Sequence, residues 1–203
     1  MPSIADSRLP MSPEFYKRVS RIKERWTTVV SLSNHFNPSK VIRPEHVTAI
    51  VTGDYPRLRE IGEAYGDNPA QAIVFGIVTN IIENAGGKEM LTPMQVSSLA
   101  ATIYAEHPWM KITELLLFAQ RFKGGHYGRF FGAQDPTVIT EALLKFREEL
   151  NSIYEKEEKR KAEERLEKEL RNPRLMTYEE YQESERVIKQ IEAEYYMETR
   201  WNK

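Results

Sequence analysis

Apolar residues recur along this chain at the spacing of helix faces. The clearest series follows Pro69, where apolar positions three and four residues apart predict a helix with a broad buried face. The pair Gly86-Gly87 then supplies a stop. We expect this segment to be the central helix of the core, with a face made of Ala70, Ile73, Val74, Ile77, Val78, Ile81 and Ile82.

Similar patterns predict helices on both sides of it. Residues 13–33 indicate one amphipathic helix, and two shorter helices are expected around 44–52 and 55–65. Strand patterns are nearly absent, and the short connections imply helices packed on their neighbours. The chain is therefore predicted to be all-α, a helical bundle. The two faces after the central helix are Val96, Leu99, Ala100 and Ile103, and, beyond His107-Pro108-Trp109, Ile112, Leu115, Leu116, Ala119 and Phe122.

Proline behind a capping residue marks several of the predicted helix starts. Glutamine or glutamate three residues after the cap completes a capping box at some of them. These signals place helix starts at Ser12-Pro13, Asn68-Pro69 with Gln71, Thr92-Pro93 with Gln95, Asp135-Pro136, and Thr177 with Glu180.

The pattern changes after Asp135. A coiled-coil-like apolar seam begins at Ile139 and fails at Glu157. Between Lys145 and Arg171 nine basic and nine acidic residues cancel, and pairs at i, i+4 spacing support an exposed helix. We expect a long charged helix ending at Asn172-Pro173 and a final short helix. The predicted parts are a disordered tail at 1–10, a helical globular domain at 11–154 and a charged helical extension at 155–203.

Composition excludes several classes of site. The 203 residues include no cysteine, which removes disulfides, thiolate metal sites and a cysteine nucleophile, and the net charge is −1. The four histidines lie too far apart for a local metal motif. No secretory signal or membrane-spanning apolar run is present. We expect a cytoplasmic, non-enzymatic protein with no metal, no cofactor and no membrane contact.

One stretch, RFKGGHYGRFFGAQDP, combines cations, glycines and aromatic residues, and no acid lies between Glu114 and Asp135. Cations beside aromatic rings are used by proteins that bind single-stranded nucleic acid. The same residues can also form a helix stop whose aromatic rings cover the core. The candidate binding residues, for nucleic acid or a protein partner, are Arg121, Lys123, His126, Tyr127, Arg129, Phe130 and Phe131.

Residues 91–146, including LLLFAQRFKGGHYGRFFGAQDP, resemble a poorly characterised family of bacteriophages and of mobile elements in gut bacteria. Their layout is also similar to the small helical domains of phage helicase loaders. This resemblance implies an accessory role in DNA replication, exerted by binding a replication protein.

Two functions follow as hypotheses. In the first, the protein is an adaptor that contacts a replication protein, or nucleic acid, through the stretch from Arg121 to Phe131. In the second, it is a virion or scaffold protein that forms a homo-oligomer through its helical extension, which would make it virion-associated.

Overall fold

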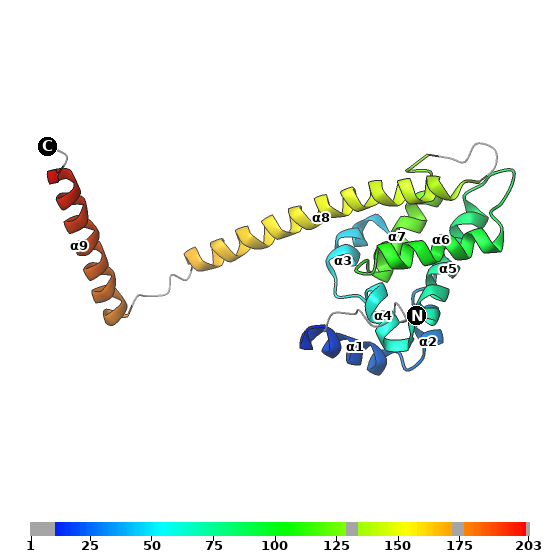
Figure 1. Ribbon diagram of the computed structural model, residues 1–203, viewed down its shortest axis with the longest axis horizontal. Helices are drawn as coiled ribbons and strands as arrows, with labels where there is room; N and C mark the ends of the chain where they lie inside the picture. The colour runs from blue at the N-terminus through cyan, green and yellow to red at the C-terminus, as the bar shows by residue number, and fades with distance from the viewer. Residues whose placement is uncertain (1–10, 129–133, 172–176, 202–203) are drawn as a thin grey trace, which may run out of the picture. The chain divides into compact units, whose positions relative to one another are not determined.

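The computed structural model describes residues 11–128, 134–171 and 177–201 (Figure 1). The all-α prediction is confirmed. An isolated antiparallel β-bridge joins Arg57 and Lys111. The tail expected at 1–10 lies outside the described residues. The elements are α1 (Pro13–Arg25), α2 (Val29–His35), a 3₁₀ turn (Pro44–His46), α3 (Val47–Thr52), α4 (Leu58–Tyr65), α5 (Asp67–Asn84), α6 (Pro93–Glu106), α7 (Ile112–Lys123), α8 (Pro136–Arg171) and α9 (Tyr178–Trp201).

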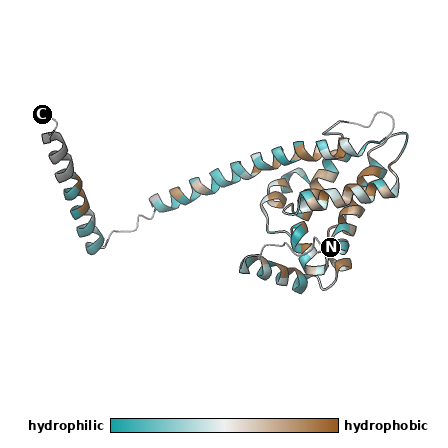
Figure 2. Ribbon diagram, viewed as in Figure 1, coloured by the Kyte–Doolittle hydropathy of each residue, from teal (hydrophilic) through white to brown (hydrophobic). Residues whose placement is uncertain are grey.

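The chain divides into two compact units, residues 1–157 and 158–203. Helix α5 is central to the first unit, where it packs against α4, α6 and α7. All seven apolar residues of its predicted face are buried. The first turns of α8 complete this core with Ile139, Leu143, Phe146 and Leu150. Figure 2 shows that the remainder of α8 is largely hydrophilic.

Most of the predicted helix starts are confirmed. The side chain of Ser12 accepts from the Phe15 N–H at 3.3 Å, and the Asp135 carboxylate accepts from the Thr137 N–H at 2.8 Å. Capping boxes form at Thr92 with Gln95 and at Thr177 with Glu180.

The start predicted at Asn68 is wrong. Helix α5 begins at Asp67, two residues before the predicted first helical residue Pro69, and its cap is Gly66. Gly66 has a φ of 97°, a conformation that favours glycine, and it ends α4 and begins α5 in a single residue. A capping residue at Asn68 is therefore not needed.

The single helix predicted for residues 13–33 is divided in two. Trp26 is extended and ends α1, and Thr28 begins α2 through a capping box with Ser31. The break lets the Trp26 ring contact the ring of Phe36, with centroids 5.3 Å apart. Val30, which a continuous helix would bury, is 63% exposed.

Candidate functional site

The residues predicted to bind a partner follow one another at the end of α7. Arg121 and Lys123 lie in its last turn, and His126 and Tyr127 follow in the turn beyond it. Gly125 and Gly128 have φ of 77° and 103°, which explains why glycine occupies these positions. Arg129, Phe130 and Phe131 lie outside the described residues.

Arg121 contacts its own chain. Its guanidinium pairs with the carboxylate of Glu149 on α8 and lies over the ring of Phe146, 5.8 Å from the centroid. The Tyr127 hydroxyl donates to the same carboxylate at 3.3 Å, and its ring packs 5.9 Å from that of Phe118. Burial raises the pKa of Tyr127 to about 12. These contacts join the turn after α7 to α8, which is a structural role.

Lys123 is also used within the fold. Its ammonium donates to the side-chain oxygen of Asn80 on α5 at 2.6 Å and to the Pro38 carbonyl at 3.4 Å. Burial lowers the pKa of this lysine. Two of the three cations in the predicted surface therefore have intramolecular partners. His126 is exposed, and whether this stretch binds a partner remains a prediction.

The end of the same stretch is structural as well. Gln134 is buried, and its amide nitrogen donates to the carbonyls of Ile82 at 2.9 Å and Gly86 at 2.6 Å. Its amide oxygen accepts from the Leu91 N–H at 3.3 Å. Gln134 thereby links the entry to α8 with the connection between α5 and α6.

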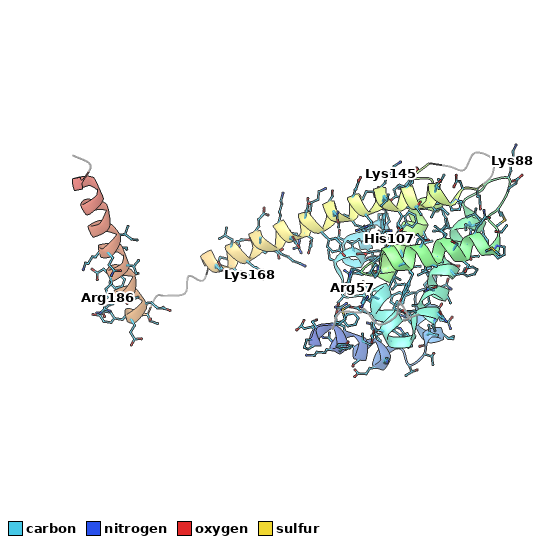
Figure 3. All side chains as sticks on the ribbon, viewed as in Figure 1. Arg57, Lys88, His107, Lys145, Lys168 and Arg186 are labelled. Carbon is cyan, nitrogen blue, oxygen red and sulfur yellow. The ribbon has the colours of Figure 1, made fainter. Side chains whose placement is uncertain are left out.

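A separate cleft of about 530 Å³ lies on the first unit, between the start of α4, the turn from α6 to α7, and α8. Figure 3 labels Arg57, which directly precedes α4, and His107, which directly follows α6, and both residues line this cleft. The lining combines basic, acidic and apolar groups. Its charged and titratable members are Arg57, Glu106, His107, Lys111, Glu114, Arg147 and Tyr154.

Two helix starts side by side build one wall of the cleft. Residues Arg57 and Lys111 precede α4 and α7, and the backbones there exchange hydrogen bonds, Leu58 N–H to the Met110 carbonyl at 2.9 Å and Ile112 N–H to the Pro56 carbonyl at 2.9 Å. Each start is capped by a buried carboxylate three residues on. Glu60 accepts from the Arg57 N–H and Glu114 from the Lys111 N–H, both at 2.9 Å.

The Lys111 ammonium is buried beside this wall. It donates to the carbonyls of Val51 at 2.6 Å and Gly53 at 2.8 Å, and Glu114 also accepts from the Tyr154 hydroxyl. Burial lowers the pKa of Lys111, opposed by Glu114 and assisted by Arg57. Both carboxylate oxygens of Glu114 are occupied, so this acid is not available to a ligand's cation.

Arg147 and His107 lie in contact with each other in the lining of the cleft. Its Nη1 lies 3.3 Å from Nδ1 of His107, and no carboxylate in the part of the chain that the structure describes forms an ion pair with Arg147. Burial lowers the pKa of His107, and the charge of Arg147 lowers it further. Because a guanidinium can only donate, this contact requires a neutral imidazole in which Nδ1 accepts and the proton lies on Nε2.

Sequence reasoning did not assign Arg57, His107, Lys111 or Arg147 to a site. The available signal was the repeated arrangement of a basic residue, an apolar residue and a glutamate at Arg57-Leu58-Arg59-Glu60 and Lys111-Ile112-Thr113-Glu114. That arrangement marks a helix start rather than a cleft. Their convergence depends on tertiary packing.

In the second unit, α9 extends over 24 residues, longer than the short helix expected. It exposes apolar side chains at helical spacing, and the exposed fractions of Tyr181, Ile188 and Ile191 are 54%, 55% and 60%. The side chains of Tyr195, Tyr196 and Trp201 lie outside the described side chains. Residues 177–201 contain seven acidic and three basic residues, so the apolar row has acidic surroundings.

The described residues contain no group of three or more histidine, aspartate or glutamate side chains placed to hold a metal ion. None of their helices combines the length and apolar character needed to span a bilayer.

Comparison with known proteins gives one family. Residues 91–192, half of the chain, match the model of a family of unknown function, DUF6633. That region begins just before α6 and extends into α9, so it includes the turn from α6 to α7, all of α8 and the exposed residues of α9 named above. No curated protein and no solved structure matches the chain.

Proposed function

The chain belongs to the DUF6633 family of unknown function, and we propose that it is a non-enzymatic adaptor that binds a partner protein through α9. One observation carries this proposal, the row of exposed apolar side chains on α9. A helix that buries such a row in a complementary groove is a recurrent mode of protein recognition, with anchors three, four and seven residues apart. Tyr181, Ile188 and Ile191 have this spacing.

The charges on α9 favour a basic partner over a second copy of the chain. Glu185 and Glu192 flank the apolar row, and a second α9 would bring further acids against them. A groove with a basic rim would instead be complementary, which raises the rate of association and discriminates against wrong partners. The resemblance of residues 91–146 to phage and mobile-element proteins favours a replication protein, such as a replicative helicase, as that partner. Such a partner implies a cytoplasmic location.

The test is capture by the full-length chain. The immobilised chain is expected to retain a replication protein from a bacterial lysate, identified by mass spectrometry, and to bind it again once that protein is purified. The double variant Ile188→Ser/Ile191→Ser is expected to lose this binding. The matched control Gln182→Ser/Gln190→Ser changes exposed, uncharged polar positions of the same helix and should retain it.

Other results would contradict the adaptor. If light scattering shows an oligomer that only the Ile188→Ser/Ile191→Ser variant dissociates, the protein self-assembles through α9, which is the scaffold hypothesis. If that variant lowers the melting temperature of the full chain far more than the control does, α9 covers its own chain. Equal capture by both variants would remove α9 as the binding element.

A further inference from the structure

The lining of the cleft on the first unit contains one more positive than negative group, with Arg57, Lys111 and Arg147 against Glu106 and Glu114. Lys111 and Glu114 are both engaged within the fold, and Arg57 lies 3.6 Å from the buried carboxylate of Glu60. Arg147 is therefore the cation best placed to meet a ligand. No described carboxylate pairs with Arg147, whose neighbour is the neutral ring of His107. An anion placed between these groups would relieve the repulsion among them.

The pKa directions agree with this charge distribution. Burial and then the charge of Arg147 lower the pKa of His107. Burial also lowers the pKa of Lys111, where Glu114 opposes the shift and Arg57 and Arg18 add to it as smaller causes. The titratable groups facing His107 are Glu106 on its own helix and Arg147 on α8, and Glu106 only partly offsets the arginine. Beside His107 and Arg147, therefore, the surrounding charges favour a nearby anion.

The apolar part of the lining specifies the kind of anion. Trp109 is 52% exposed although it lies in the turn that forms the cleft wall, and Met110 and Leu150 line the same space. The edge contact with Phe15, at a centroid distance of 6.3 Å, and the Arg59 guanidinium 5.8 Å from the ring hold the indole in place. A fixed, exposed indole is a platform on which a base can stack.

We propose that this cleft binds a nucleotide, with its phosphates against Arg57 and Arg147 and its base on Trp109. The volume of about 530 Å³ lies within the range of small-ligand sites. Arginine suits the phosphates because its planar guanidinium can donate two parallel hydrogen bonds to one phosphate. The site lies wholly in the first unit and does not depend on the proposed role of α9.

The test is calorimetric titration of the full chain with ATP at low salt, with pyrophosphate and adenosine in parallel. ATP is expected to bind more tightly than either fragment, and Arg147→Gln is expected to weaken ATP at least about tenfold, the usual loss for a charge-assisted hydrogen bond. Lys145→Gln is the matched control, because Lys145 is an exposed cation on α8 that does not line the cleft (Figure 3). Trp109→Leu should weaken ATP and leave pyrophosphate unchanged.

A second readout follows the His107 ring by NMR. Bound phosphate would raise the pKa of His107, so its ring signals should shift when ATP is added and should not shift with adenosine alone. The proposal is overturned if neither ATP nor pyrophosphate binds at millimolar concentration, or if Arg147→Gln and Lys145→Gln weaken ATP equally. If pyrophosphate binds as tightly as ATP and Trp109→Leu does not change the affinity for ATP, the base makes no contact and the cleft is not a nucleotide site.

Discussion

Nη1 of Arg147 lies 3.3 Å from Nδ1 of His107, a contact between two side chains that can both carry positive charge. The contact joins α8 to the end of α6, forty residues apart in sequence. It is favourable only while the imidazole is neutral, because a protonated ring has no acceptor to offer the guanidinium. The fold therefore selects one protonation state of His107.

The first prediction concerns the pKa of His107. Burial and Arg147 both lower it, so Arg147→Gln should raise it toward the ordinary value while leaving the depression due to burial. Titration of the ring signals by NMR in the full-length chain measures this. Lys145→Gln should leave the pKa unchanged, and an equal change in both variants would refute a specific role for Arg147.

Because the pKa of His107 is lower in the folded chain than in the unfolded chain, the unfolded chain binds the proton first as the pH falls. The free energy of unfolding should therefore decrease as the pH falls from about 6.5 through the lower folded pKa. His107→Gln should remove that part of the pH dependence, measured by urea unfolding at a series of pH values. An unchanged slope in this variant would contradict the prediction.

The second prediction concerns the buried carboxylate of Glu60. Arg18 on α1 donates from Nε to Oε1 of Glu60 at 2.6 Å and from Nη2 to Oε2 at 3.3 Å, and Glu60 has no exposed surface. Arg18→Ala leaves that charge in the core without its main partner, which costs about 3–5 kcal/mol of unfolding free energy. Denaturant unfolding with circular dichroism measures the loss.

Arg21→Ala is the matched control for Arg18→Ala. Arg21 lies on the same helix, is 59% exposed, and approaches Asp54 only at 3.9 Å. Its loss should change stability by less than about 1 kcal/mol, as for other surface pairs. Equal effects of the two substitutions would show that the guanidinium of Arg18 does not stabilise the fold through Glu60.

Local sequence pattern predicts much of this fold and little of its polar contacts. The face of α5 and four of the five predicted caps follow from the spacing of residues within a single helix. The division after Trp26 does not, because it depends on the packing of that ring against Phe36. The position of this helix break is therefore set by a tertiary contact.

Tertiary contacts also explain why the sequence alone does not identify the surroundings of the candidate sites. The cations at Arg121 and Lys123 look uncompensated because no acid lies near them in sequence, yet Glu149 reaches Arg121 from α8 and Asn80 reaches Lys123 from α5. The cleft residues likewise come from separate helices, so no local motif marks them. The apolar row of α9, by contrast, is a property of one helix and is visible in its spacing.

The third prediction separates the structural and binding roles of Arg121. The pair with Glu149 is partly exposed, so a double-mutant cycle of Arg121→Ala and Glu149→Ala should give a coupling of about 0.2–1 kcal/mol in unfolding free energy. If Arg121 also contacted nucleic acid, Arg121→Ala would weaken retention on single-stranded DNA in a salt-dependent way, and Glu149→Ala would not. Zero coupling would mean that the ion pair does not stabilise the turn.

The fourth prediction concerns the contact between the Tyr104 side chain of α6 and Gly62 of α4. A Cβ at this position would lie 1.9 Å from the Tyr104 hydroxyl, which donates to the Asp67 carboxylate at 2.7 Å. Gly62→Ala must displace that hydroxyl or separate the helices, and such overpacking costs about 1–3 kcal/mol.

Gly76 on α5 offers the opposite case, because nothing lies within 4 Å of its Cβ position. Gly76→Ala should therefore stabilise the chain by about 0.5–1 kcal/mol, since alanine restricts the unfolded state of a helix position.

Thermal and denaturant unfolding of the two variants measure both effects. Addition of Tyr104→Phe to Gly62→Ala should recover part of the loss, because it removes the oxygen that the new methyl group meets, although it also removes the bond to Asp67. If Gly62→Ala proves as stabilising as Gly76→Ala, the Tyr104 hydroxyl does not lie against Gly62, because a methyl group would then find room there without displacing it.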